Sequence, residues 1–402
     1  MKRNIVNYPL VIIPLISLNL LLLNSNVGFY DFSYYLPRIP FWDLQAGINV
    51  VWPCYQKIGF DLFILNVDTF PSINSCSNYN YGYFSVFAFG FISLLNSSAV
   101  VVGFVQVFIF LFLVSKIYFA KNRLGKDFLV MVALFSPGVI LLEVSGNLDI
   151  QIVNLLLLAN ITLNSGKEKF TLSLICLTSF LKFYTAPILF LACFFVKRRN
   201  SRIYGFFLSL FTAMGFSYQF AKTPLTPFVD GAQNKFGAEI LDNYARRLGF
   251  NLSSFQGELI GLFSLLAVFF FIVFCYKKFK VINVTNFKSL ALHSEMLLIN
   301  FIFMAGTSVI LYVTALNVDY KLTFIALAGI ALIRLPQIRV KFISNAFPYI
   351  WLTSLWFSFP VSSISSQIHL DLQPIGDLAM IITIAYFMFQ GVLAIKLIHN
   401  RD

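Results

Sequence analysis

The sequence has 402 residues, of which 58% are hydrophobic and only 11% are charged, and its formal net charge is +12. Soluble globular domains have about 45–50% apolar and about 25% charged residues. This composition excludes an ordinary soluble domain, a disordered chain and a small disulfide-bonded scaffold. We therefore expect a polytopic membrane protein.

The apolar segments predict an all-α fold: a transmembrane helix bundle of about ten to twelve spans with both termini in the cytoplasm. Residues 1–402 form one membrane domain. Residues 8–23 follow two cations and are interpreted as an uncleaved first span. Residues 24–82 form a long first outside loop that carries short interfacial helices. After it, residues 83–95 are short enough to lie in the interface, and residues 99–118 are long enough to cross the membrane.

Basic clusters separate the later apolar segments and mark the expected cytoplasmic loops. They stand at residues 116–126, 167–169, 197–202, 277–288, 334–341 and 396–401. Because basic residues stay on the cytoplasmic side, topology explains the net charge of +12, and no nucleic-acid partner is needed. A second outside loop, residues 222–257, contains a predicted amphipathic helix at 236–248 that could lie flat at the interface.

Residues 170–196 are too few for two full crossings, although both of their flanks look cytoplasmic. Two crossings need about 40 residues, so we expect a short hairpin with its tip, near Lys182, inside the outer half of the bilayer. A buried ammonium there needs an anionic partner or a wet cavity. Lys182 therefore either pairs with an acid and holds helices together or binds a ligand.

Histidine and cysteine are scarce, at three and five residues. A His-based metal site or a Ser-His-Asp triad is therefore not expected, and no divalent metal is indicated. Cys54 and Cys76 both fall in the first outside loop. In an oxidising compartment they would form a disulfide, which we favour over two free thiols. The other cysteines lie in spans and are interpreted as packing residues.

Carboxylates at the outer membrane boundary are the candidate catalytic groups. Asp31, Asp43 and Asp149 are placed where an acid can serve as general base for a hydroxyl acceptor. Other outer-face acids are interpreted as solvated loop residues, namely Asp61, Asp68, Asp230 and Asp377. The few outer-face cations near span ends could hold a lipid phosphate, or they could pair with these acids: Lys182, Arg246, Arg247 and Lys321.

Five short motifs occur in a fixed order along the chain. They are Asp43-Leu44-Gln45-Ala46-Gly47 with Gly59-Phe60-Asp61, Asn80-Tyr81-Gly82-Tyr83, Ser136-Pro137 with Gly146-Asn147-Leu148-Asp149, Leu181-Lys182-Phe183-Tyr184, and Asp319-Tyr320-Lys321-Leu322. Their order and placement resemble the GT-C superfamily of integral membrane glycosyltransferases. Within this superfamily the motifs most resemble those of bacterial polyprenyl-phosphate mannosyltransferase-like proteins, although two of the motifs lack the prolines of that branch.

The resemblance implies a hexosyltransferase of polysaccharide biosynthesis with a GT-C fold, acting on the periplasmic or extracellular side of a cell membrane, by analogy the bacterial inner membrane. The donor would be a polyprenyl-phosphate sugar and the acceptor a glycan or a lipid-linked saccharide; no nucleotide site is needed, and a divalent metal is possible but not indicated. Asp43 or Asp31 would be the base, and Lys182 with Arg246 or Lys321 would bind the donor phosphate. The sugar or acceptor would contact Glu143, Asn147, Tyr81, Asp319 and Tyr320.

Two other functions remain open. Arg246 and Gly257 bracket ten residues, a weak match to a pattern of O-antigen polymerases and ligases. The third candidate function is that of a transporter or lipid flippase with twelve spans. Transporters place ionisable groups near mid-membrane and often show two similar halves. The expected gathering of charges at the outer boundary, and a first loop without a counterpart, favour the enzyme.

Overall fold

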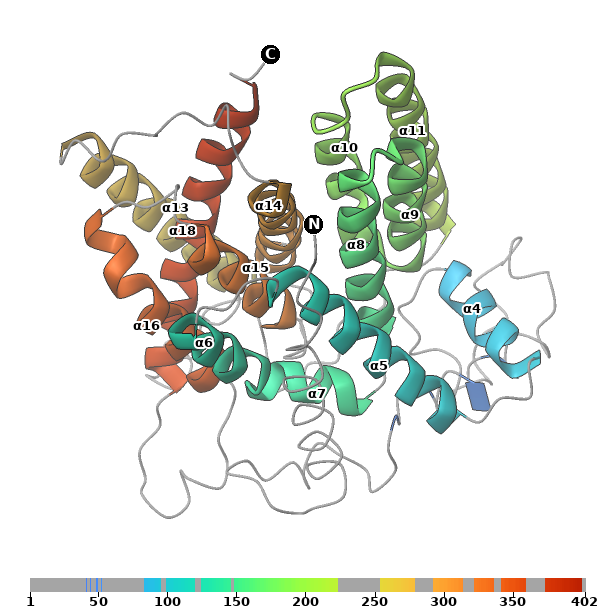
Figure 1. Ribbon diagram of the computed structural model, residues 1–402, viewed down its shortest axis with the longest axis horizontal. Helices are drawn as coiled ribbons and strands as arrows, with labels where there is room; N and C mark the ends of the chain where they lie inside the picture. Colours follow the sequence, from blue (N-terminus) through green and yellow to red (C-terminus); the bar gives the residue numbers. More distant parts are fainter. Residues whose placement is uncertain are drawn as a thin grey trace. The chain divides into compact units, whose positions relative to one another are not determined.

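The computed structural model describes residues 41, 44, 48–49, 52, 83–94, 99–119, 124–145, 148–222, 254–278, 292–313, 322–335, 341–358 and 373–399. Thirteen α-helices and one short 3-10 helix, η6 (Phe183–Thr185), are formed within these ranges, and no β-strand is found in them (Figure 1). The all-α prediction is therefore confirmed for the described residues.

Four of the described helices are long and apolar enough to cross a membrane: α5 (Ala99–Tyr118), α13 (Ser254–Lys278), α14 (Leu292–Val313) and α18 (Gln373–His399). A fifth span exists if α7 (Pro137–Ser145) and α8 (Leu148–Asn164), separated by a short break, count as one. Several apolar helices indicate a multi-pass membrane protein. The expected ten to twelve spans and the location of the termini stay predictions.

The chain divides into two compact units, each built from separate stretches of sequence. One unit contains residues 1–34, 114–142 and 233–402, and the other contains residues 35–113 and 143–232. Neither unit is a continuous segment, because the chain leaves the first unit after α7 begins and returns to it beyond residue 232. Each unit is described by itself below.

In the unit that holds most of the C-terminal half, α15 (Leu322–Arg334) is the central helix. All thirteen of its residues are buried, so a polar side chain that packs against α15 needs a hydrogen-bond partner there. Trp351 of α16 (Lys341–Phe357) donates its indole N–H to the Ile325 carbonyl at 3.0 Å. Tyr118 donates its hydroxyl to the Leu327 carbonyl, also at 3.0 Å. These bonds fix the packing around α15.

Asp377 corrects one of the sequence interpretations. We expected a solvated loop residue, but Asp377 lies in the first turns of α18 and is only 3% exposed. The helix starts at Gln373, which carries the carboxylate inside the packed helices α14, α16 and α18. An acid at the end of an apolar run has the same sequence signature whether it is solvated or covered by neighbouring helices.

The second unit contains the helices that build the candidate site. Here α8 and α9 (Glu168–Leu181) pack together, joined by a turn in which Gly166 adopts a positive φ of 74°. After η6, α10 (Ala186–Cys193) packs against α9, and α11 (Arg199–Lys222) packs against both. The short hairpin expected for residues 170–196 is confirmed as α9, a break at Lys182, and α10 (Figure 1).

The outer surface of this unit is rich in exposed phenylalanine. On α10 and α11 the exposed apolar side chains are Phe190, Ile203, Phe206, Phe207, Leu210, Phe211 and Met214. Water-soluble monomers rarely expose apolar surface so continuously, whereas helices that face lipid do. The apolar surface therefore agrees with a membrane environment for α10 and α11.

Candidate functional site

Asp149 occupies the first turn of α8 and is completely buried. A carboxylate is favoured at this position because the N-terminus of a helix carries a partial positive charge. The structure places Asp149 inside the packed helices of the unit rather than in a loop, and the outer-face location of this helix end stays a prediction.

Lys182 stands at the break between α9 and η6. Its backbone is extended, with φ −148° and ψ 126°, while its N–H still donates to the Thr178 carbonyl at 3.0 Å. The Thr185 hydroxyl then donates to the Lys182 carbonyl at 3.1 Å, which closes the turn. Pro187 follows in the first turn of α10, a position that suits proline because the N–H it lacks would have no helical partner.

Two of the predicted site residues in this unit, Asp149 and Lys182, form an ion pair. Lys182 Nζ lies 2.9 Å from Asp149 Oδ2 and donates a hydrogen bond to it. The Asp149 side chain is fully buried, while the Lys182 side chain is 12% exposed. A pair of charges in this setting is costly to desolvate and is retained where geometry and hydrogen bonds compensate. The expected anionic partner of Lys182 is thus Asp149.

Tyr184 completes the arrangement. Its hydroxyl donates to Asp149 Oδ1, so each oxygen of the carboxylate accepts a bond from the hairpin tip. Tyr184 is itself buried, at 3% exposure. Tyr184 belongs to one of the five sequence motifs, but it was not among the predicted site residues. Its position two residues beyond Lys182, at the predicted hairpin tip, was the available signal.

Other buried polar groups of this unit lie on α5, α7 and α8. Glu143 of α7 is 3% exposed, and its Oε2 has no hydrogen-bond partner. Asn154 of α8 donates to the Gln106 carbonyl of α5 at 3.0 Å, yet the side-chain oxygens of both residues lack partners. Unsatisfied buried polar atoms mark places where a water molecule or a ligand group is expected.

Comparison with known proteins finds no relative. No protein-family model, no curated protein and no solved structure matches the chain significantly. The geometry of the site is therefore the basis for any functional assignment, together with the motif resemblance.

The structure brings Asp149, Lys182 and Tyr184 together and places Glu143 in the same unit. The remaining predicted site residues lie outside the described residues: Asp31, Asp43, Cys54, Cys76, Tyr81, Asn147, Arg246, Arg247, Asp319, Tyr320 and Lys321. Their roles and the predicted disulfide stay predictions. Within the described ranges, no group of three His, Cys, Asp or Glu residues is placed to hold a metal ion.

Proposed function

We propose that this protein is a membrane glycosyltransferase that moves a sugar from a polyprenyl-phosphate donor to a glycan or lipid-linked acceptor on the outer face of the membrane. The observation that carries the proposal is the buried Asp149–Lys182 pair, with Tyr184 on the same carboxylate. An ionisable pair inside an apolar helix bundle is a functional-site hypothesis by default. The motif resemblance supplies the reaction class.

The length of α9 supports a site that lies below the outer membrane surface. Fourteen residues at 1.5 Å rise give a helix of about 21 Å, against a hydrocarbon thickness of about 30 Å. Lys182, which follows the last residue of α9, would then stop within the outer leaflet. That depth suits the phosphate of a lipid carrier whose chains remain in the bilayer.

In the proposed reaction Lys182 binds the donor phosphate and Asp149 positions Lys182. The Lys182 side chain is 12% exposed, so a phosphate oxygen could approach it while the buried carboxylate holds it in place. A charged donor near the phosphate stabilises the negative charge that develops as this group leaves. Asp149 thus acts through Lys182, and the predicted base is Asp43 or Asp31.

In the proposed reaction, the bonds formed and broken and the proton transferred are all accounted for by the donor, the acceptor and the base. The acceptor oxygen attacks the anomeric carbon and gives its proton to the carboxylate of the base. The bond between the anomeric carbon and the phosphate oxygen breaks, and its electron pair leaves with the lipid phosphate. A single displacement of this kind inverts the configuration at the anomeric carbon.

Transfer from synthetic polyprenyl-phosphate sugars by the purified full-length protein in nanodiscs tests this proposal. We expect Lys182→Gln to lower the transfer rate by about 10²–10³, the usual effect of removing one transition-state donor. Lys116→Gln, which removes an exposed cation in the last turn of α5, is the matched control and should keep full activity. Full activity of Lys182→Gln, or no transfer from any such donor, would exclude the assignment.

One observation favours the transporter as the second candidate. Buried charge pairs such as Asp149–Lys182 also occur on substrate and ion pathways of transporters. The same purified protein in sealed proteoliposomes distinguishes the two functions. Solute uptake that depends on Lys182, in a preparation that transfers no sugar, would support the transporter.

A further inference from the structure

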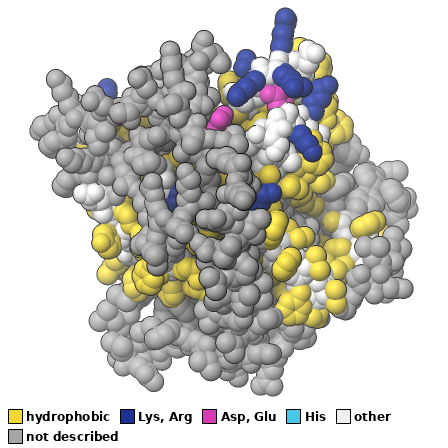
Figure 2. All heavy atoms as spheres, viewed as in Figure 1, with side chains coloured by type: hydrophobic (Ala, Val, Ile, Leu, Met, Phe, Trp, Pro, Cys, Tyr) yellow, Lys and Arg dark blue, Asp and Glu magenta, His cyan; other side chains and the backbone are white. Residues whose placement is uncertain are grey.

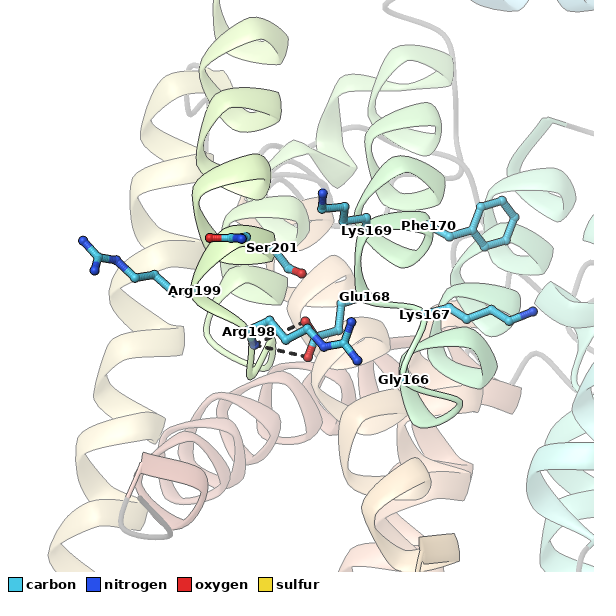
Figure 3. Close-up of a pocket in the computed structure, with 9 residues that line it drawn as sticks. Gly166, Lys167, Glu168, Lys169, Phe170, Arg198, Arg199 and Ser201 are labelled. Carbon is cyan, nitrogen blue, oxygen red and sulfur yellow. Dashed lines mark hydrogen bonds between the residues drawn. The ribbon is translucent and has the colours of Figure 1, made fainter.

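A cavity of about 550 Å³ opens at the end of the second unit opposite to Lys182. It lies between the start of α9 and the start of α11 (Figure 3). Among the described residues that line it, four are cations, Lys167, Lys169, Arg198 and Arg199, and one is a carboxylate, Glu168, which gives this part of the lining a net charge of +3. The cavity is about 20 Å from Lys182, the length of α9.

Glu168 is bound by the backbone rather than by these cations. It is 8% exposed, and its Oε1 accepts the N–H of Lys197 at 2.8 Å. The N–H of Arg198 donates to both oxygens, at 3.4 and 3.3 Å (Figure 3). The carboxylate therefore takes up backbone donors at the start of α11 and fixes the loop that carries the arginines.

The cations that line the cavity remain available to an anion. All four are exposed, and none forms an ion pair with a residue that the structure describes. Arg202, the next cation along α11, donates its Nε to the Val196 carbonyl at 2.7 Å and so also holds the loop. The positive-inside rule explains why cations gather at this end of the helices. It does not explain why they line a cavity in which the one carboxylate among the described lining residues is already satisfied.

Apolar side chains continue directly from this basic end. Phe170, which lines the cavity, is 53% exposed, and Phe194, three residues before Lys197, is 58% exposed. Phe206 and Phe207 continue the apolar surface along α11 at 59% and 61% exposure. Figure 2 shows dark blue side chains at this end of the unit and yellow ones beside them. A ligand that fits both parts carries a phosphate at one end and acyl chains at the other.

We propose that this cavity binds the headgroup of an anionic phospholipid of the cytoplasmic leaflet. The guanidinium groups of Arg198 and Arg199 offer forked donors to phosphate oxygens, and Lys167 and Lys169 add point charges. The acyl chains lie along the exposed phenylalanines. Basic pockets between helices at the cytoplasmic surface are of the type that binds anionic headgroups. This site is independent of the proposed sugar transfer, because it lies at the other end of α9.

The test uses the full-length protein in nanodiscs that contain equal amounts of phosphatidylglycerol and phosphatidylcholine with the same acyl chains. Native mass spectrometry then gives the ratio of the two lipids retained on the protein. We expect phosphatidylglycerol to be retained preferentially. Arg198→Gln with Arg199→Gln should lower the ratio by about twenty-fivefold, since each cation near an anionic surface contributes about fivefold. The backbone donors to Glu168 are unchanged in this variant.

The matched control removes two exposed cations that do not line the cavity, by Lys116→Gln with Lys277→Gln, and should leave the ratio unchanged. Equal retention of the two lipids by the unaltered protein would overturn the proposal, as would the same loss in both double variants. A third arm adds millimolar glycerol 3-phosphate, which has the headgroup chemistry without acyl chains. Complete displacement of phosphatidylglycerol by it would identify a free phosphate site and exclude the lipid.

Discussion

Lys182 and Asp149 lie 33 positions apart in the chain, yet their side chains meet at 2.9 Å. The bond ties the end of α9 to the first turn of α8. At the opposite end of the same two helices, the hydroxyls of Thr162 and Thr171 meet at 2.9 Å. The helix pair is thus joined by polar contacts at both ends, and the end with the ion pair is the one we propose for catalysis.

A double-mutant cycle on the ion pair separates its structural role from its functional role. Breaking a buried pair by one substitution costs about 3–5 kcal/mol, because the remaining charge is left uncompensated. We therefore expect Asp149→Leu and Lys182→Leu each to lower the melting temperature strongly in detergent. The double variant should recover most of the stability, since replacing both charges by apolar groups is often neutral.

Sugar transfer should respond differently in the same cycle. If Lys182 binds the donor phosphate, the double variant remains inactive even though its stability is restored. Measuring the transfer rate and the melting temperature on one preparation gives both readouts. A stable double variant with full transfer activity would show that the ion pair only holds α8 and α9 together.

Tyr184 offers a smaller change at the same carboxylate. Tyr184→Phe removes the hydroxyl that donates to Asp149 Oδ1, and leaving a buried acceptor without this donor costs about 1–3 kcal/mol. Tyr204→Phe is the matched control, because the Tyr204 hydroxyl bonds the Ser173 hydroxyl at 2.9 Å in a part-buried position. Unfolding in denaturant should show the larger loss for Tyr184→Phe. Equal losses would mean that the Tyr184 bond adds nothing specific to the site.

Packing around α15 predicts opposite effects for two glycines. A Cβ at Gly329 would overlap the indole ring of the fully buried Trp351, so Gly329→Ala should destabilise the protein by about 1–3 kcal/mol. Gly391 of α18 has open space, and Gly391→Ala should stabilise it by about 0.5–1 kcal/mol through helix propensity. The melting temperatures of the two variants should therefore move in opposite directions. A shift of the same sign in both would contradict the packing of α16 on α15.

The sequence predicted local elements well because their signals are local. The span 99–118 coincides with α5, and the short hairpin of residues 170–196 is formed with its break at Lys182. A length argument sufficed for the hairpin, since 27 residues between two basic clusters cannot cross twice. The need for an anionic partner or a wet cavity at its tip followed from the cost of burying an ammonium.

The identity of that partner could not be predicted in the same way. Several acids have similar sequence surroundings, and only the packing of α8 on α9 brings Asp149 to Lys182. The interpretation of Asp377 as a solvated residue was wrong for the same reason, because its burial depends on helices distant in sequence. Tyr184 was not predicted as a site residue because a tyrosine beside a helix break is equally compatible with a place at the membrane–water interface. Tertiary contacts decide all three cases, and a single sequence carries no direct record of them.

Two buried glutamates lead to the last prediction, because their surroundings differ. Glu143 has an oxygen without a partner, whereas Glu168 accepts the N–H groups of Lys197 and Arg198. Glu143→Met removes a poorly satisfied polar group and should raise stability by about 1–3 kcal/mol. Glu168→Met leaves backbone donors without acceptors and should lower it by about 1–3 kcal/mol or more.

Sugar transfer then shows why Glu143 is retained. A group kept at a cost to stability is expected where function needs it, so the more stable Glu143→Met variant should transfer sugar more slowly than the unaltered protein. Glu143→Gln keeps the shape and the polarity of the side chain and separates loss of charge from loss of hydrogen bonding. A stabilised Glu143→Met variant with an unchanged transfer rate would remove Glu143 from the proposed sugar or acceptor site. Denaturant unfolding of Glu168→Met provides the reference for a glutamate whose role is to hold a loop.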